Sequence, residues 1–347
     1  MEGFTKLEHQ AAGHDGILVD ESGTLFIKPS TAQEIEFYTQ VHDLGLEEEE
    51  AAENSTDQEK FLQEGDRLVD YIPVFFGTLE SGITKKVEET TQISDDLKQL
   101  DIKNTQDGKK SNDEKPYLVI KNLLHGYKNP SIIDIKLGAV LHDERTPDEK
   151  KERLQNVSKS TTSGSLNYRV CGQKLYHEHI PDLSKFSEKS REHVTKTDDG
   201  YLIFDKWFGR ELTPDNVVEN FKIYFRHNKL SKDQQDILLR NFYTRLQLLY
   251  NCLLSYEVRI RSGSLLFIYE NDPKRWEELD NIDPLFDQDL TDEDDEEDDE
   301  DEEYKPSSLS SMTLIDFAHS KFTPGKGPDE NIIQGIENLI DALDQLL

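Results

Sequence analysis

The chain has 347 residues, a formal net charge of −32 and two cysteines, Cys171 and Cys252. So negative a charge argues against direct nucleic-acid binding, and two cysteines are too few for a disulfide framework. The N-terminus lacks the basic and apolar regions of a signal peptide, and no apolar run approaches the length of a membrane span. We therefore expect a protein of the nucleus and cytoplasm.

The N-terminal third predicts a few short ordered elements between two polar segments. Pro29 ends the first strand because proline has no backbone N–H to donate. The polar segments, about 45–65 and 81–114, carry few apolar side chains and are interpreted as insertions. The ordered elements are expected to be a strand at 24–28, a helix at 32–41, and strand-like segments at 68–79 and 116–122.

The rest of the chain predicts buried strands and long amphipathic helices. The helix at 232–255 has the clearest pattern, since Leu238, Phe242 and Leu246 recur at helical spacing. We also expect helices at 148–157, 215–225 and 330–346, a loop at 160–165, and strands at 131–137, 167–176, 201–204, 264–269 and 313–317.

This order of elements favours an α+β fold with two lobes and a cleft between them. We place the N-terminal lobe at residues 1–125 and the C-terminal lobe at 126–347. Residues 284–308 are interpreted as a disordered acidic linker. The unbroken acidic run within it, 292–303, is either a solvated linker or a contact for a partner protein.

Asp134 and Lys136 stand two residues apart in the strand predicted at 131–137, so their side chains lie on one face. Burying opposite charges among apolar residues is costly unless they are paired or functional. One interpretation is a structural ion pair. The other is phosphoryl transfer, which needs a cation on the nucleotide phosphates, a carboxylate for magnesium and a group near the attacking hydroxyl.

Two further features fit the same chemistry. Lys28 ends a strand and Glu34 follows in the next helix, an arrangement that protein kinases use to hold nucleotide phosphates. Strand-ending lysines are, however, usually just solvated. Asp316, in Ile-Asp-Phe, resembles the magnesium-binding aspartate of Asp-Phe-Gly, although Ala318 replaces the glycine.

Basic side chains gather in two places of this acidic chain. A charged helix face is usually only a solvated surface. In so acidic a protein, however, such clusters are the plausible seats for a polyphosphate. The clusters are Lys150, Lys151, Arg153 and Lys159 after the Asp134 strand, and Lys206 and Arg210 around Trp207.

Three motifs together resemble the inositol polyphosphate kinase family. Residues 130–138 fit its Pro-x-x-x-Asp-x-Lys-x-Gly signature in full. Residues 263–266, Gly-Ser-Leu-Leu, resemble its Ser-Ser-Leu-Leu strand with the first serine replaced, and 315–317 match its Ile-Asp-Phe. The fungal multikinases of the family are the most similar, on the basis of residues 8–16, 161–166, 309–320 and the acidic run.

The resemblance implies a kinase-like fold with antiparallel sheets, a nucleotide cleft, and ATP and Mg²⁺ as cofactors. It makes Asp134 and Lys136 catalytic, with Asp134 contacting the ribose or acting as a base. The implied ligands are Lys28, Glu34, Lys121, Asn122, Leu123, Asp134 and Asp316 for the nucleotide, Asp316 and Ser264 for the metal, and Lys136, Lys150, Lys151, Arg153, Lys206 and His319 for the inositol phosphate.

The resemblance also implies an activity. The inositol-binding helical segment, 139–166, is short, and an open site suits several substrates. We therefore expect a multikinase that phosphorylates inositol 1,4,5-trisphosphate to tetrakis- and pentakisphosphate. Two alternatives are an inositol hexakisphosphate kinase and an acidic scaffold with a kinase fold, since the fungal relative is linked to a transcription-factor complex that controls arginine genes. Run 292–303 would then contact transcription factors.

Overall fold

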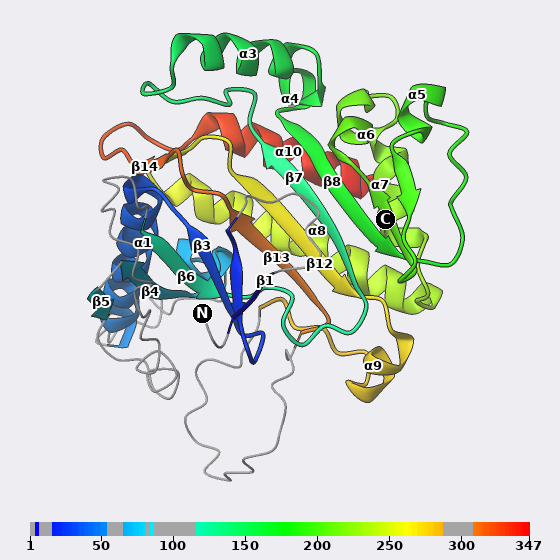
Figure 1. Ribbon diagram of the computed structural model, residues 1–347, viewed down its shortest axis with the longest axis horizontal. Coiled ribbons are helices and arrows are strands. Elements are labelled where there is room, and N and C mark those ends of the chain that lie inside the picture. The colour runs from blue at the N-terminus through cyan, green and yellow to red at the C-terminus, as the bar shows by residue number, and fades with distance from the viewer. Residues whose placement is uncertain (1–3, 7–15, 54–64, 81–82, 87–115, 287–307) are drawn as a thin grey trace, which may run out of the picture.

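The computed structural model describes residues 4–6, 16–53, 65–80, 83–86, 116–286 and 308–347. Within them two six-stranded antiparallel sheets lie next to each other, and helices cover one face of the second sheet (Figure 1). The predicted α+β class with antiparallel sheets is therefore confirmed. Most of the two predicted insertions and the whole of run 292–303 lie outside the described residues.

The first sheet comes from the N-terminal part of the chain, with strand order β1-β2-β3-β6-β4-β5. Leu25, Ile27 and Val119 form a small apolar cluster on it. Helix α1 (Ala32–Glu53) packs against β4 and reaches β14 of the C-terminal part. The strands are β1 (Phe4–Lys6), β2 (Leu18–Asp20), β3 (Leu25–Pro29), β4 (Phe75–Glu80), β5 (Ile83–Lys86) and β6 (Tyr117–Lys121).

The second sheet has the strand order β13-β12-β7-β8-β10-β9, so β7 lies near its centre. Ile133, Ile135 and Leu137 of β7 are fully buried in the main core. The alternate residues Asp134 and Lys136 therefore lie on the opposite face. The strands are β7 (Pro130–Leu137), β8 (Tyr168–Tyr176), β9 (Val194–Lys196), β10 (Tyr201–Phe204), β12 (Ser264–Glu270) and β13 (Ser310–Ile315).

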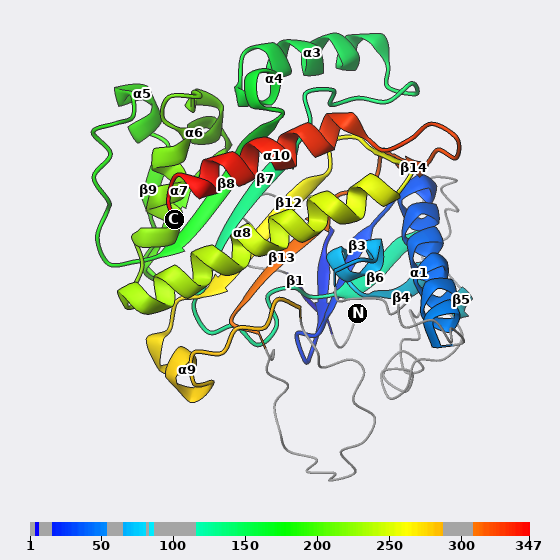
Figure 2. The same ribbon diagram turned by 180° about the vertical axis from the view of Figure 1, so that it is seen from behind.

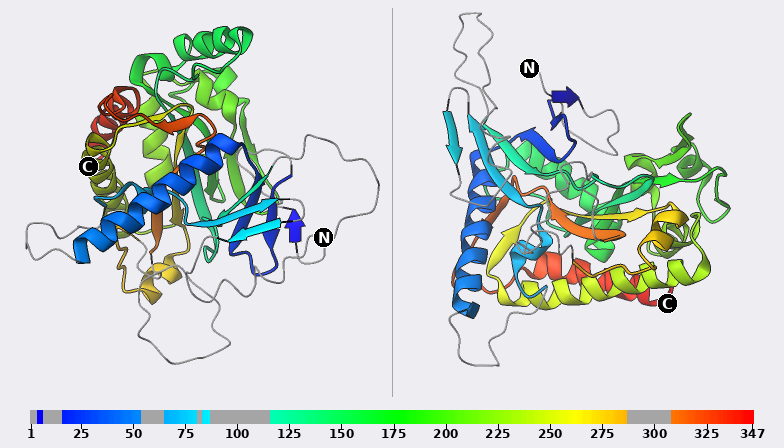
Figure 3. Two further views of the ribbon diagram at one scale, coloured as in Figure 1. Left: turned by 90° about the vertical axis from the view of Figure 1, so that its left-hand side faces the viewer. Right: turned by 90° about the horizontal axis from the view of Figure 1, so that it is seen from below.

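Three helices form the layer behind this sheet: α7 (Val217–Arg226), α8 (Lys232–Ser255) and α10 (Glu330–Asp344). Figures 2 and 3 show α8 and α10 running side by side across that face. Ser231 starts α8 with a capping box in which its hydroxyl accepts from the Gln234 N–H. None of the described helices combines the length and apolar character that crossing a bilayer requires. The layer covers one face of β7, and Asp134 and Lys136 lie on the other.

The smaller elements lie around the edges of the two sheets. Helices α3 and α4 stand beyond the ends of β7 and β8 (Figure 1). Strands β11 and β14 form a two-stranded sheet of their own. Their bounds are η2 (Leu68–Tyr71), α3 (Asp148–Lys159), α4 (Thr162–Leu166), α5 (Glu188–Arg191), α6 (Lys206–Glu211), β11 (Val258–Ile260), α9 (Pro273–Glu278) and β14 (Ser320–Phe322).

Several predicted elements differ from the structure near their ends. Helix α1 continues to Glu53 instead of stopping at Val41, because Glu, Ala and Leu dominate this stretch and favour helix. The strand predicted at 68–79 is a 3₁₀ turn followed by β4, because Pro73 interrupts it. The loop predicted at 160–165 contains α4 instead.

The acidic linker begins later than the predicted residue 284. Phe286 is still packed, with its ring 5.4 Å from that of Tyr71. Asp283 is buried and accepts from the backbone N–H groups of Leu309 and Ser310 at 2.8 and 2.9 Å. The two ends of the linker are therefore tied together. The predicted boundary between lobes near residue 125 stays a prediction.

Candidate active site

Strand β7 carries the Asp-x-Lys pair between β12 and β8. Lys136 is paired with Ser264 on one side and with Arg169 on the other. The pairing with β8 shifts between Asp134 and Ile135, which leaves Cys171 as an extra residue of a bulge. Bulges beside functional sites redirect side chains, and this one lies next to Asp134.

Asp134 is held in a destabilising environment. Its Oδ1 atom and the Ser264 hydroxyl are both buried without a hydrogen bond of good geometry to the described residues, although Ser264 lies close enough to Asp134 to act against the rise in its pKa. Burial raises the pKa of Asp134, Lys136 opposes the rise and the Asp316 carboxylate adds to it. The predicted alternative of a structural ion pair with Lys136 is wrong, since no such pair occurs within 4.0 Å in the described chain. Buried polar atoms that lack good hydrogen bonds and lie close together indicate a site where a ligand supplies the missing partners.

Lys136 is positioned by the turn between β11 and β12. Its Nζ donates to the Ser262 carbonyl at 2.5 Å. Ser262 has a φ of 58°, in the left-handed region, and its hydroxyl donates to the Leu141 carbonyl at 2.9 Å. A serine in this conformation carries backbone strain, which fits a position that orients a functional group.

The first sheet contributes Lys28, whose Nζ lies 2.8 Å from Glu34 Oε1 and 3.8 Å from Asp316 Oδ1. Glu34 also accepts from the Ser30 hydroxyl at 2.6 Å and from the Phe317 N–H at 3.2 Å. The predicted residues Lys28, Glu34 and Asp316 thus come together, although Asp316 lies far from the other two in the sequence. The Lys28–Glu34 pair bridges the sheet and α1, as the kinase pattern requires.

Asp316 is not inside a strand, as the sequence predicted. Strand β13 ends at Ile315 because Asp316 adopts a φ of 68°, which a strand cannot accommodate. Its side chain is 48% exposed. Phe317 next to it is buried and stacks on Phe37 of α1 at 4.8 Å between ring centroids. The buried ring fixes the turn that presents the Asp316 carboxylate.

The oxygen atoms at this place are of the kind that bind a divalent cation. No group of three or more His, Cys, Asp or Glu side chains that could hold a metal occurs in the described residues. Mg²⁺ commonly takes one or two carboxylates and completes its shell with water and substrate phosphates. Asp316 and Asp134, with the Ser264 hydroxyl beside them, supply that kind of donor set. The site therefore fits a cation that arrives with a nucleotide.

The predicted adenine contact, 121–123, begins at the last residue of β6. The Lys121 and Asn122 N–H groups donate to the Val74 and Thr24 carbonyls at 2.9 and 2.7 Å. The Leu123 N–H has no acceptor among the described residues. Of the backbone donors in this segment, Leu123 is thus the one that remains for a base.

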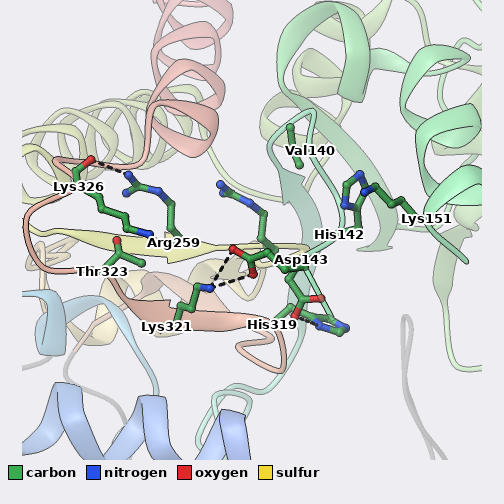
Figure 4. A pocket seen from close by; sticks show the side chains of 11 residues that line it. Val140, His142, Asp143, Lys151, Arg259, His319, Lys321, Thr323 and Lys326 are labelled. Atoms are coloured by element: carbon green, nitrogen blue, oxygen red, sulfur yellow. Dashed lines mark hydrogen bonds and ion pairs between the residues drawn. The ribbon is translucent and has the colours of Figure 1, made fainter. Parts of the chain in front are cut away.

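A pocket of about 280 Å³ opens between the β14 region and α3 (Figure 4). The predicted residues Lys151 and His319 line it, whereas Lys150, Arg153 and Lys206 do not. His319 Nδ1 lies 2.9 Å from Asp143 Oδ2. Partial burial acts to raise the pKa of Asp143, but hydrogen bonds from Thr146 and His319 lower it overall.

Lys206 lies elsewhere, on α6. Its Nζ sits 5.6 Å from the centre of the Trp207 ring, and Arg210 stacks over the same ring at 4.5 Å. These residues form a cation–aromatic cluster that contributes no lining to the pocket. The predicted substrate roles of Lys150, Arg153 and Lys206 stay predictions.

The sequence did not single out four cations that line the pocket. They are Arg259, Arg261, Lys321 and Lys326. Arg169, buried beside Lys136, was also missed. The available signal was the alternation Arg-Ile-Arg at 259–261, which places both guanidinium groups on one face of a short strand.

The cost of burying the charged Asp134 carboxylate leads to a testable prediction. Asp134→Asn should raise Tm at pH 7, because the ionised carboxylate disfavours the folded state when its pKa is raised. The gain over wild type should shrink as pH falls and should vanish below about 4, where Asp134 becomes protonated in the unfolded as well as the folded state. Thermal unfolding of both proteins across this range measures the effect. A lower Tm of the variant at pH 7 would show that Asp134 stabilises the fold.

Comparison with known proteins places this geometry in a family. The model for "Inositol polyphosphate kinase" matches residues 117–344. Inositol polyphosphate multikinase of Saccharomyces cerevisiae is 40% identical over 98% of this chain and 98% of its own. Inositol hexakisphosphate kinase 3 of Mus musculus is 30% identical over 65% of this chain and 50% of its own.

A solved structure has the same fold. The crystal structure of the S. cerevisiae inositol phosphate multikinase with ADP and Mn²⁺ superposes with a TM-score of 0.67 at 36% identity, covering 93% of this chain and 99% of that one. The predicted kinase-like fold is thereby confirmed. With the Asp-x-Lys strand, the Lys28–Glu34–Asp316 group and these matches, the chain belongs to the inositol polyphosphate kinase family.

Proposed function

We propose that this protein is an ATP- and Mg²⁺-dependent inositol polyphosphate multikinase that converts inositol 1,4,5-trisphosphate to tetrakis- and pentakisphosphate. The observation that carries the proposal is the meeting of Lys28, Asp316 and the Asp134–Lys136 face beside a pocket rich in cations. The extent of the match to the S. cerevisiae multikinase, over nearly the whole of both chains, supports it.

Each residue has a defined task in this proposal. Lys28, steadied by Glu34, neutralises the nucleotide phosphates. Lys136 holds the reacting hydroxyl near the transferred phosphoryl group and stabilises its charge. Asp134 contacts the ribose hydroxyls or takes the proton from the attacking hydroxyl. Asp316 and Ser264 would hold a divalent cation, which would neutralise charge on the nucleotide phosphates.

Inositol hexakisphosphate kinases are the rival in the same family, because they also match this chain. Their match covers about two thirds of the chain, less than that of the multikinase. Incubation with ATP and an equal mixture of inositol trisphosphate and hexakisphosphate separates the two. We expect consumption of the trisphosphate and the ordered appearance of tetrakis- and pentakisphosphate. Preferred conversion of hexakisphosphate to a pyrophosphate would contradict the proposal.

We also propose residence in the nucleus and cytoplasm, and contact with transcription factors through the acidic run 292–303.

A further inference from the structure

Two cations face each other across the small sheet next to the pocket. Arg259 of β11 is directly opposite Lys321 of β14. Like charges in this position repel each other and destabilise a strand pair. The Arg259 guanidinium is also fixed, since it donates to the Val258, Lys326 and Gly327 carbonyls at 2.6 to 2.8 Å. No carboxylate lies within 4.0 Å of it in the described part of the chain. An unfavourable pair built this rigidly points to an anion that binds between the two.

Lys326 adds a third cation from the loop after β14. Glu257 holds that loop by accepting from the Gly325 and Gly327 N–H groups at 2.6 and 2.8 Å. Both glycines have a positive φ, a backbone conformation that would be strained for a residue with a side chain. The Lys326 ammonium itself forms no hydrogen bond or ion pair with the described residues. The loop thus presents an uncommitted ammonium at the pocket, where Figure 4 shows it beside Arg259.

Two carboxylates line the pocket near these cations, and Glu144 is the one that pairs with Lys321. Glu144 accepts from Lys321 Nζ at 3.0 and 2.9 Å, but the side chain of Glu144 is 74% exposed. Exposed pairs of this kind contribute little to stability. Asp143, beside it, is different, because it is buried and is also bonded by Thr146 at 2.7 Å. Glu144 is therefore the carboxylate that a more highly charged anion can replace.

We propose that Arg259, Lys321 and Lys326 form a distal phosphate subsite, and that Lys321 exchanges Glu144 for a phosphate of the substrate ring. The reacting end of the site is close by, because Arg261 lines the same pocket and the next residue, Ser262, holds the Lys136 ammonium. The inference rests on the proposed function. It names the ligand class of this wall as inositol phosphates with four or more phosphate groups.

The chemistry of repeated phosphorylation explains why such a subsite is needed. Each round turns a hydroxyl into a dianionic phosphate, and the product must bind again as the next substrate. A single cation at the reacting position cannot neutralise the phosphates that point away from it. Charge-assisted hydrogen bonds from a second group of cations can, and they favour the more phosphorylated ring.

Lys326→Met and Lys321→Met test the subsite by calorimetric titration with two probes, inositol 1,4,5-trisphosphate and inositol pentakisphosphate. Each variant should weaken pentakisphosphate binding by about tenfold, as expected for one charge-assisted contact, and trisphosphate binding by about twofold at most. Glu144→Gln should tighten pentakisphosphate binding because Lys321 is freed. Lys222→Met, which removes an exposed lysine of α7, is the matched control and should leave both affinities unchanged.

Equal affinities in wild type and both lysine variants would overturn the subsite, as would equal losses for the two probes. Turnover of the trisphosphate with ATP, measured on the same wild-type sample, reports separately on the proposed function. Absent turnover with a selective loss of pentakisphosphate binding would refute the kinase assignment and keep the subsite. Normal turnover without a selective loss of pentakisphosphate binding would support the kinase assignment and refute the subsite.

Discussion

Asp316→Asn is expected to lower kcat by about a thousandfold, the cost of losing a group that neutralises transition-state charge. Asparagine is the informative replacement here, because Asp316 has a φ of 68° and asparagine tolerates the left-handed region. The fold should therefore keep its Tm, and only the charge disappears. The affinity for Mn²⁺ in the presence of ADP, measured by calorimetry, should fall together with kcat.

Asp280→Asn is the matched control for this variant. Asp280 also has a positive φ, 51°, but it follows α9 and is not among the residues proposed to bind the nucleotide or the metal. It should leave kcat and Mn²⁺ affinity unchanged. If Asp316→Asn retained wild-type kcat and Mn²⁺ affinity, Asp316 would not be the metal ligand.

Lys136→Met is expected to lower kcat by between about a hundredfold and a thousandfold. Methionine keeps the unbranched apolar stem and removes the ammonium that Ser262 positions. The affinity for ADP should change little, since Lys28 and Glu34 hold the nucleotide phosphates in this account. Steady-state kinetics with ATP and inositol trisphosphate, together with ADP titration, measure both quantities.

Lys196→Met controls for the loss of a lysine that donates to a carbonyl. Lys196 Nζ is bonded to the Glu178 carbonyl at 2.6 Å in much the same way, but it lies on the edge strand β9. Its replacement should leave kcat unchanged. Wild-type kcat in Lys136→Met would remove Lys136 from the chemistry.

The sequence predicted the parts of the site that depend on local pattern. The alternation of Asp134 and Lys136 with buried Ile and Leu sets their common face, and the structure has that face opposite α8 and α10. Local periodicity is sufficient for that feature. The pattern alone left the pairing of Lys28 with Glu34 open, and the family resemblance implied it; the structure places them at a strand end and in the first turn of a helix, 2.8 Å apart.

The far wall of the pocket could not be predicted in this way. Arg259 and Lys321 meet only because β11 pairs with β14, two three-residue strands separated by the acidic linker. Strands so short leave almost no periodic signal. Lys206 is a different case, since the sequence suggested substrate binding from the basic residues around Trp207, and the structure places its Nζ 5.6 Å from the centre of the Trp207 ring and outside the lining of the pocket. Its substrate role stays a prediction.

Transfer of the γ-phosphoryl group of ATP to an inositol phosphate is the central claim, and one measurement tests it most directly. Wild-type protein and Asp316→Asn are each incubated with γ-labelled ATP, Mg²⁺ and inositol 1,4,5-trisphosphate, and the inositol phosphates are separated. We predict label in tetrakisphosphate first and pentakisphosphate later with wild type, and almost none with the variant. No labelled inositol phosphate from wild type, or equal labelling by both proteins, would contradict the account.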